Sequence, residues 1–394
     1  MAEQAVGLVV AGAGARGAYE AGALSVLVPA LARHGQRPTV FVGTSAGALN
    51  VLLFASLSHL DPDEAAEQAL GMWRAVRWSD VVRPLARSTL RNTVRYLGQL
   101  LHLPGVQVSS LLDPAPLGRT IAGWKHWDDL HRNVQEGRVA SIAMVATSFT
   151  TNQTTVFLEQ HPRRPVPERD DGRGVDYLPV KLASSHVLAS ASIPAIFPAM
   201  HVADAGPTGN WYADGGVRLN APIKPAVALG ADRVVIVATD PLEGVPVDQG
   251  RTAPDLYDAV AQVLHAAMVD RMAEDVRTLD KVNRLVSAGL QRGVAKSRGG
   301  RPYRLIPRIY VGPTRPGIIA AIAEEVLSRR RRGEQPALDV DLVLLRTALG
   351  GARSHGELLS YLLFDPVFVE RLIELGRHDA ERLLETSDLR NLWR

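Results

Sequence analysis

A serine stands between two glycines in the pentapeptide Gly43-Thr44-Ser45-Ala46-Gly47, which matches the pattern G-x-S-x-G. An apolar run over residues 39–42 precedes it, and a second apolar stretch with helical character, Ala46 to Ser56, follows it. A strand-to-helix turn of this kind is the setting of a nucleophilic serine, because glycines on both sides leave room for a crowded backbone. The pattern predicts a nucleophile at Ser45, and the alternative is an ordinary turn rich in glycine and serine.

A glycine-rich segment upstream, Gly12-Ala13-Gly14-Ala15-Arg16-Gly17, joins an apolar run over residues 6–10 to a helical pattern that begins near Ala18. It matches G-x-G-x-x-G, which after a strand is typical of dinucleotide-binding folds. Those folds place an acidic residue at the end of the second strand, where this chain has Thr44 and Ser45. The competing interpretation is an oxyanion hole, in which each backbone N–H donor is worth roughly 3 kcal/mol to the transition state.

A carboxylate beside two glycines, Asp214-Gly215-Gly216, is the third candidate segment. Such a tripeptide also occurs as a plain turn. A Ser-His-Asp triad is the alternative, and His186, His201 and His265 are the more internal histidines of the sequence. None of the three lies in a recognisable loop after a late core strand. If no histidine serves, an aspartate hydrogen-bonded directly to the serine must take its proton, as a dyad in place of a triad.

Together these segments resemble the patatin-like phospholipase family, whose members combine a glycine-rich oxyanion loop, a G-x-S-x-G serine and a later Asp-Gly-Gly or Asp-Gly-Ala. The three motifs occur here in that order. The resemblance extends to the segment Ala-Ser-Ala-Ser-Ile-Pro-Ala-Ile-Phe-Pro at residues 189–198, and it covers about residues 5–240. The fold that it implies is a three-layer α/β/α sandwich with a central, mostly parallel sheet.

The resemblance also implies a role for each motif. Ser45 would be the nucleophile and Asp214 the general base, followed by Gly215 and Gly216 of the aspartate motif. The nucleophile elbow would consist of Gly43, Thr44, Ala46 and Gly47, and the oxyanion amides would come from the loop Gly12, Ala13, Gly14, Ala15, Arg16 and Gly17. Arg16 matches the family's basic residue, which either holds the loop in shape or favours anionic substrates. Ala13 departs from the three successive glycines common in the family, so the donor pair stays open.

The elements that must position these residues alternate between strand and helix from the start of the chain, a pattern that predicts an α/β core with parallel strands. Further strands are predicted at residues 140–147, 154–158, 233–238 and 305–311, and helices at 183–192, 256–285 and 317–328. We expect a catalytic core at 5–240 with an insertion near 75–125. Residues 241–394 then form a mostly helical extension of that core.

The composition is that of an ordinary globular protein: of 394 residues, 46% are hydrophobic and 22% charged, which allows a sizeable core. There is no cysteine, so disulfides, thiolate metal sites and cysteine nucleophiles are excluded. No run of 18 apolar residues is present, and Glu3 stands where a signal peptide carries positive charge. We expect a cytoplasmic protein whose membrane contact, if any, is peripheral.

Four arginines recur at every fourth residue, Arg83, Arg87, Arg91 and Arg95, with three leucines and one valine on a neighbouring face. This pattern indicates an amphipathic helix, and one hypothesis is that it docks on anionic lipid or acts as a lid. The alternative is a helix packed on the core with a solvated arginine face.

The resulting prediction is a serine-dependent lipid acyl hydrolase that works through an acyl-enzyme intermediate and needs no metal or organic cofactor. Its expected partners are a lipid or other ester substrate and an anionic membrane surface, with no nucleic acid. The alternatives are a catalytically silent lipid-binding or interaction module with the same fold, and, more weakly, a dinucleotide-dependent enzyme. Head group, acyl length and oligomeric state are left open.

Overall fold

The structure is a computed structural model that describes residues 4–83, 112–194, 196–206, 209–242, 271–288, 304–331, 355–386 and 389–393. Three of the four periodic arginines, His265, and the predicted helix from 256 up to residue 270 lie outside the described residues. No helix within the described ranges is both long enough and apolar enough to span a membrane.

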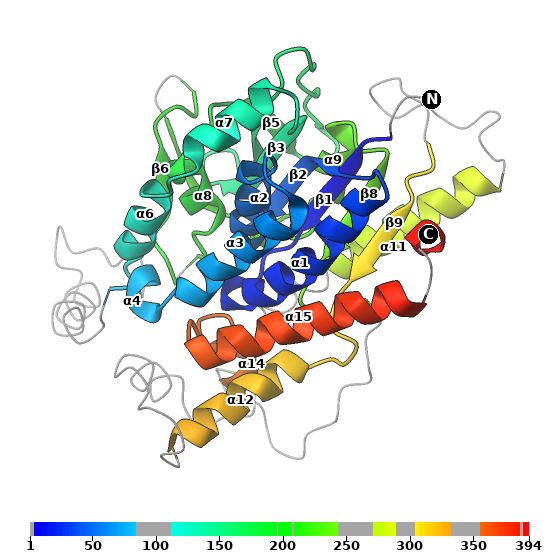
Figure 1. Cartoon of the computed structure of the whole chain (residues 1–394). Helices are drawn as coiled ribbons and strands as arrows, with labels where there is room; N and C mark the ends of the chain where they lie inside the picture. Colours follow the sequence, from blue (N-terminus) through cyan, green and yellow to red (C-terminus); the bar gives the residue numbers. More distant parts are fainter. Residues whose placement is uncertain are drawn as a thin grey trace, which may run out of the picture.

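Strands and helices follow one another along the chain (Figure 1). The strands are β1 (Val6–Val10), β2 (Pro38–Thr44), β3 (Ser141–Ser148), β4 (Thr154–Gln160), β5 (Val175–Pro179), β6 (Met200–Val202), β7 (Asn210–Asp214), β8 (Arg233–Val237) and β9 (Arg308–Val311). The helices are α1 (Gly17–Arg33), α2 (Ala46–Ser56), α3 (Pro62–Ala75), α4 (Trp78–Val81), α6 (Ala115–Ala122), α7 (Trp127–Gln135), α8 (Ser184–Ser190), α9 (Ile223–Ala228), α11 (Arg271–Ser287), α12 (Ile318–Arg331), α14 (His355–Ser360), α15 (Pro366–Thr386) and α16 (Leu389–Leu392). Two 3-10 turns, η1 (Gly14–Arg16) and η2 (Gly215–Val217), complete the described elements.

The described strands form one sheet in the order β5-β4-β3-β2-β1-β8-β9, with β7 pairing β3 and β6 pairing β7. Pairing is parallel from β3 through β2, β1 and β8 to β9. It is antiparallel where β3 meets β4 and β7. The predicted α/β core with mostly parallel strands is thereby confirmed.

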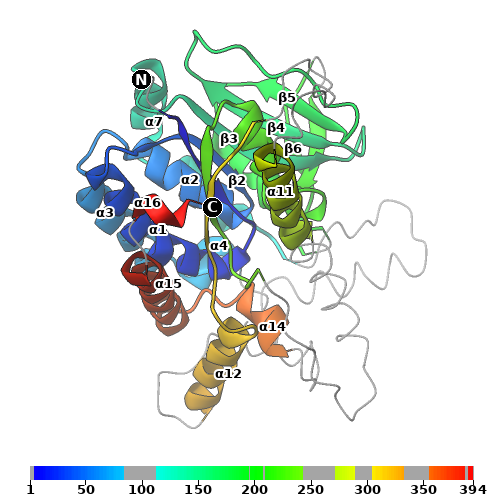
Figure 2. The same cartoon turned by 90° about the vertical axis from the view of Figure 1, so that its right-hand side faces the viewer.

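Both faces of the sheet are covered by helices. Alternate residues of β1 belong to different cores: Leu8 and Val10 pack on one side, and Val9 and Ala11 on the other. Helices α1, α2, α3 and α15 supply the first core, whereas α9 and α11 supply the second. Figure 2 shows α11 across the strands from α1, α2 and α3. The three-layer α/β/α arrangement that the family resemblance implied is therefore present.

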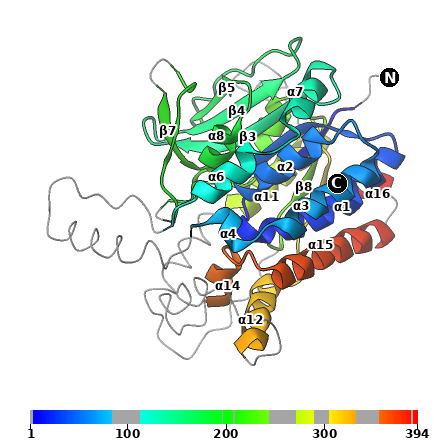
Figure 3. The same ribbon diagram turned by 60° about the vertical axis from the view of Figure 1, so that its left-hand side comes forward.

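Helix α15 lies along α1, more than 330 residues away in sequence (Figures 1 and 3). Close approach of the two helices depends on glycines at the contact. A Cβ at Gly376 would lie 2.0 Å from the carbonyl oxygen of Tyr19, and one at Gly22 would lie 2.3 Å from that of Ile373. The Tyr19 hydroxyl also donates to Asp379 Oδ2 over 2.9 Å. The C-terminal region is thus packed tightly on the first helix of the core.

Candidate active site

The pairing register of β3 brings the ends of β2 and β7 together. Thr44, the last residue of β2, pairs with Val145 of β3, and Asp214, the last residue of β7, pairs with Ala146. Strand β4 occupies the other side of β3 over these residues, so β2 and β7 must share one side and meet end to end. Ser45 follows β2 directly, and the sheet therefore places Ser45 next to Asp214.

Ser45 stands on a strained turn between β2 and α2. Its φ of 54° and ψ of −123° lie in a region that residues other than glycine rarely adopt. The Ser45 amide donates to Ser190 Oγ over 2.9 Å, and that hydroxyl donates to the Val145 carbonyl over 2.6 Å. Ser190 thereby ties the turn to β3 and helps to hold the strained backbone in place.

The two glycines of the pentapeptide are required by space. A Cβ at Gly43 would lie 2.3 Å from the carbonyl oxygen of Gly47, and a Cβ at Gly47 would lie 2.3 Å from the carbonyl oxygen of Val10. No rotamer change relieves a clash with main-chain atoms. The crowding explains why the sequence pattern has glycine on each side of the serine.

The segment that follows Asp214 connects the three motifs. Gly215 fits only without a side chain, because its Cβ would lie 2.3 Å from the Val145 carbonyl oxygen. Beyond η2, the carbonyl of Leu219 accepts from Thr44 Oγ1 over 3.1 Å, and Asn220 Oδ1 accepts from the Gly12 amide over 2.9 Å. The aspartate segment thus holds both the serine turn and the glycine-rich loop.

The Asp214 carboxylate is buried, with 2% of the residue exposed. Its Oδ1 accepts from the Gly216 amide over 2.7 Å, and its Oδ2 has no hydrogen-bond partner among the described residues. Burial raises the pKa of Asp214 to about 6, although the nearby Ser45 hydroxyl and the Gly216 amide each act to lower it. The open oxygen beside Ser45 has the position and the pKa that a general base near neutral pH requires.

Four of the six predicted oxyanion amides are already engaged. Besides the Gly12 amide, Ala15 donates to the Tyr361 carbonyl, Arg16 to the Ala13 carbonyl, and Gly17 to carbonyls of the loop itself. Within the described residues, the Ala13 and Gly14 amides have no hydrogen-bond acceptor. Of the six predicted amides, these two are therefore the ones without an acceptor among the described residues.

Alanine at position 13 is accommodated without strain. Ala13 has a φ of −146°, and the positive φ of the loop, 55°, falls on Gly14. A side chain at Gly14 would meet the Tyr361 carbonyl oxygen at 2.4 Å. The departure from three successive glycines therefore falls where the backbone does not need glycine.

The histidines in the described ranges do not enter the site. His186 is fully buried, accepts from the Ala183 amide through Nδ1, and has Nε2 3.3 Å from Asp204. His201 is exposed on β6 against Trp211. Neither residue lines the cavity at Ser45. Groups of three or more metal-ligating side chains are also absent from the part of the chain that the structure describes.

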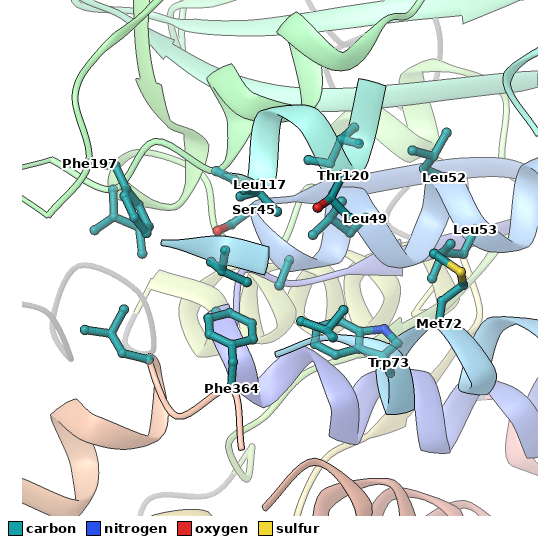
Figure 4. Close-up of a pocket in the computed structure, with 18 of the residues that line it drawn as sticks. Ser45, Leu49, Leu52, Leu53, Met72, Trp73, Leu117, Thr120, Phe197 and Phe364 are labelled. Carbon is teal, nitrogen blue, oxygen red and sulfur yellow. The ribbon is translucent and has the colours of Figure 1, made fainter. Parts of the chain in front are cut away.

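An apolar cavity of about 110 Å³ opens at Ser45. Its walls are Gly14, Ser45, Ala46, Leu49, Leu52, Leu53, Met72, Trp73, Val76, Val81, Leu117, Thr120, Ile121, Trp124, Ala191, Ile193, Phe197, Tyr361, Leu362 and Phe364. In Figure 4 the Ser45 hydroxyl faces the cavity, and Leu49 and Leu53 follow it along α2 toward Met72. Phe197 and Phe364 lie at the opposite end. The cavity suits a hydrocarbon chain attached to a group at Ser45.

Much of this wall was missed by sequence reasoning. Helix α3, which contributes Met72 and Trp73, was not predicted, although its start carries a clear signal. Asp61 accepts from the Asp63 amide over 3.0 Å as an N-cap, with Pro62 at the first helical position. The contribution of Tyr361 and its neighbours has no local signal, because it depends on a contact between distant segments.

The periodic arginine segment begins beside the cavity. Arg83 donates its amide to the Asp113 carbonyl and pairs with the Asp113 carboxylate over 3.0 Å, so the described residues before 84 and after 111 are in contact. Val81 and Leu117, on α4 and α6, line the cavity next to this junction. The amphipathic helix itself falls on residues outside the described ranges and stays a prediction.

Comparison with known proteins identifies the motif-bearing region. The model of the patatin-like phospholipase family matches residues 8–227, more than half of the chain. One matching solved structure is the crystal structure of VipD from Legionella pneumophila, with a TM-score of 0.37 and 13% sequence identity, covering 98% of this chain and 67% of that chain. The comparison with curated proteins found no match.

Replacing Asp214 by asparagine should stabilise the protein at alkaline pH. The folded-state pKa of about 6 exceeds the value of 3.8 for a free aspartate. Below pH ~4 the protonated Asp214 costs the folded protein no stability. As pH rises through about 6, the buried group ionises and the free energy of unfolding falls. We expect Asp214→Asn to gain up to about 3 kcal/mol of unfolding free energy at pH 8, with little gain at pH 4.

Urea unfolding at the two pH values measures this difference. Asp176→Asn is the matched control, because Asp176 is exposed on β5. Equal effects of the two substitutions at pH 8, or a destabilised Asp214→Asn at that pH, would contradict the burial of a costly charge at Asp214.

Proposed function

The chain belongs to the patatin-like phospholipase family, and on that premise we propose that it is a lipid acyl hydrolase in which Ser45 is the nucleophile and Asp214 is the sole general base. The observation that carries the proposal is the meeting of β2 and β7 on β3, which puts an unpaired carboxylate oxygen beside a serine at the mouth of an apolar cavity.

In the first half-reaction, Ser45 Oγ attacks the carbonyl carbon of the ester while its proton passes to Asp214 Oδ2. The carbonyl oxygen becomes an oxyanion, which the Ala13 and Gly14 amides are free to bind. Collapse of this intermediate breaks the bond to the alcohol. The departing alcohol oxygen takes the proton from Asp214, and the acyl group remains on Ser45.

Water completes the cycle in the second half-reaction. Asp214 removes a proton from water as the oxygen attacks the acyl-enzyme, and the same amides bind the second oxyanion. Breakdown releases the carboxylic acid and returns the proton to Ser45 Oγ. One carboxylate thus serves both steps, and no metal or organic cofactor enters them.

The substrate class follows from the cavity. Nearly all of its wall is aliphatic or aromatic, which favours an acyl chain over a polar group. Because a helix rises about 1.5 Å per residue, the α2 wall from Ser45 to Leu53 is ~12 Å long, the length of an extended chain of about ten carbons. Met72 lies beside Leu53 at that end (Figure 4).

Peripheral contact with a lipid surface is part of the proposal. Phe149 and Trp211 are the two most exposed of the large apolar residues in the described ranges, at 59% and 53%. The Phe149 amide donates to the Trp211 carbonyl over 3.0 Å, so the two residues are neighbours. Trp211 lies on β7, the strand that ends at Asp214. An exposed aromatic pair next to the site suits insertion at the membrane interface.

The dyad is tested by ester hydrolysis. We expect wild type to cleave p-nitrophenyl esters, and Ser45→Ala and Asp214→Asn to lose at least about a thousandfold of kcat. For wild type, kcat/KM should rise with pH to a plateau, with a midpoint near the Asp214 pKa of about 6, because the carboxylate is the active form. Asp176→Asn is the control for folding and assay.

A fluorophosphonate probe separates this enzyme from a silent binding module. Labelling of wild type that disappears in Ser45→Ala supports the nucleophile, and unlabelled wild type without esterase activity rejects it. Binding of a dinucleotide would be registered as a thermal shift with NAD or NADP, which the acyl-hydrolase assignment does not predict.

Acyl length should be set at the Met72 end of the cavity. We expect kcat/KM for p-nitrophenyl esters to peak at about ten carbons. Met72→Trp should move that peak to shorter chains, because the indole fills the end of the cavity, while the rate on the acetate ester stays close to that of wild type. Leu285→Trp, an exposed position on α11, is the control. An unchanged acyl-length profile for Met72→Trp would show that the acyl chain does not extend to Met72.

Vesicle binding should depend on the exposed aromatic pair. Trp211→Ala and Phe149→Ala should each reduce co-sedimentation with phosphatidylglycerol vesicles by several-fold, because each removes an interfacial aromatic ring. Leu285→Ala removes an apolar side chain that is 48% exposed and should leave binding unchanged. Equal binding by all four proteins would exclude the pair as a docking surface.

A further inference from the structure

The side chain of Arg16 does not face the cavity but is buried against the C-terminal region. Only 1% of the residue is exposed, and it is not part of the cavity wall. Arg16 Nε donates to Ser360 Oγ over 2.8 Å, and Nη2 donates to Glu357 Oε1 over 2.6 Å and to the Glu357 carbonyl over 3.0 Å. Asp240 Oδ2 lies 3.9 Å from Nη1. A buried guanidinium needs partners of this kind.

Tyr361 joins the same contact through its ring and its main chain. The guanidinium carbon of Arg16 lies 3.9 Å from the centre of the Tyr361 ring. The Tyr361 carbonyl accepts from the Ala15 amide over 2.8 Å. The same carbonyl oxygen lies where a side chain at Gly14 would have to go. The C-terminal region therefore contacts this loop twice, through the Arg16 side chain and through the Ala15 main chain.

These contacts connect segments that are far apart in sequence. The Arg16 hydrogen bonds to Ser360 and Glu357 span 344 and 341 positions. Both partner residues lie outside the region 8–227 that the family model matches. Glu357 and Ser360 are on α14, which packs on α12 below the core (Figure 1).

We propose that Glu357, Ser360 and Tyr361 form a C-terminal clasp that positions the Ala13 and Gly14 amides for the oxyanion by holding Arg16 and the Ala15 main chain. The inference rests on the proposed acyl-hydrolase function. Arg16 and Glu357 are positioning residues, because neither touches the reacting atoms. An oxyanion donor works only when its N–H lies at the correct distance from the developing charge, so a loosened loop lowers the rate of the chemical step.

The other role open to Arg16 is direct contact with an anionic substrate. The structure argues against this role, because the Arg16 side chain is buried and its guanidinium faces Glu357, Asp240 and the Tyr361 ring. Loss of the clasp should accordingly affect neutral and anionic esters alike, whereas a substrate-binding role would affect anionic esters selectively.

The clasp is tested by a graded series in the full-length chain. Glu357→Ala removes the carboxylate, and Glu357→Gln keeps a hydrogen-bond acceptor without the charge. Glu325→Ala is the matched control, since Glu325 forms ion pairs with Arg329 and Arg371 on the C-terminal helices. We expect kcat on a neutral p-nitrophenyl ester to fall about tenfold to a hundredfold in Glu357→Ala, less in Glu357→Gln, and not in Glu325→Ala, with KM within about twofold.

A thionoester substrate distinguishes positioning from general destabilisation. Replacing the carbonyl oxygen by sulfur weakens the hydrogen bonds of the oxyanion hole, so wild type should prefer the oxygen ester. The preference should shrink in Glu357→Ala and be retained in Glu325→Ala. A fall in kcat with the full wild-type preference would contradict the proposal, as would wild-type kinetics in Glu357→Ala.

Amide hydrogen exchange gives a readout that needs no substrate. Peptides over residues 11–18 should exchange faster in Glu357→Ala and Glu357→Gln than in wild type or Glu325→Ala. Unchanged exchange in both Glu357 variants overturns the clasp, whether or not the chain hydrolyses esters. Wild type without Ser45-dependent hydrolysis rejects the proposed function instead, and the exchange result then still decides whether the clasp holds the loop. Should Glu357→Ala fail to fold, Glu357→Gln carries both measurements.

Discussion

The backbone crossing at Ser45 is the constraint on which the rest of the structure depends. Its φ of 54° is held because Gly43, Gly47 and the β1 main chain are in contact with no side chains between them. A turn so crowded has no room to move toward a partner. The other groups near Ser45 must therefore be positioned by the elements around it, which explains why Asp214, the glycine-rich loop and the cavity wall come from separate elements.

Each of these groups reaches the serine through a different kind of interaction. Asp214 is positioned by strand register, because β7 pairs with β3 on the same side as β2 and begins its pairing where that of β2 ends. The glycine-rich loop arrives through β1, which pairs with β2 in parallel. The acyl wall arrives through α2 itself and the helices packed on it. Directional hydrogen bonds position the reacting atoms, and non-directional apolar packing is left to shape the cavity.

In the proposed mechanism, burial of Asp214 lowers the stability of the fold and raises the basicity of the carboxylate. A carboxylate in water has a pKa too low to remove a proton from serine effectively, and a histidine usually makes up the difference. Here desolvation raises the pKa of Asp214 to about 6, although the Ser45 hydroxyl and the Gly216 amide each act to lower it. Additional donors would stabilise the anion and lower its basicity. The empty Oδ2 is thus consistent with a base that acts without histidine.

How far the sequence predicts this site depends on how local each contact is. The serine turn was predictable because both glycines that its crowded backbone requires, Gly43 and Gly47, lie within one five-residue motif. The boundaries of α2 were predictable for the same reason. Strand β7 was missed, because its five residues carry no alternation: Trp211 is exposed, and Tyr212, Ala213 and Asp214 are all buried. Helix α3 was missed despite its N-terminal signal.

Arg16 shows where prediction from sequence ends. The glycine-rich motif identified the residue, but its two roles, holding the loop or binding an anion, differ only in what surrounds the guanidinium. Those surroundings come from Glu357, Ser360 and Tyr361, in a short helix and turn with no catalytic motif of their own. Because a buried charge must be neutralised by its neighbours, the Arg16 guanidinium depends on this distant segment. A substitution at Glu357 therefore alters the surroundings of the glycine-rich loop.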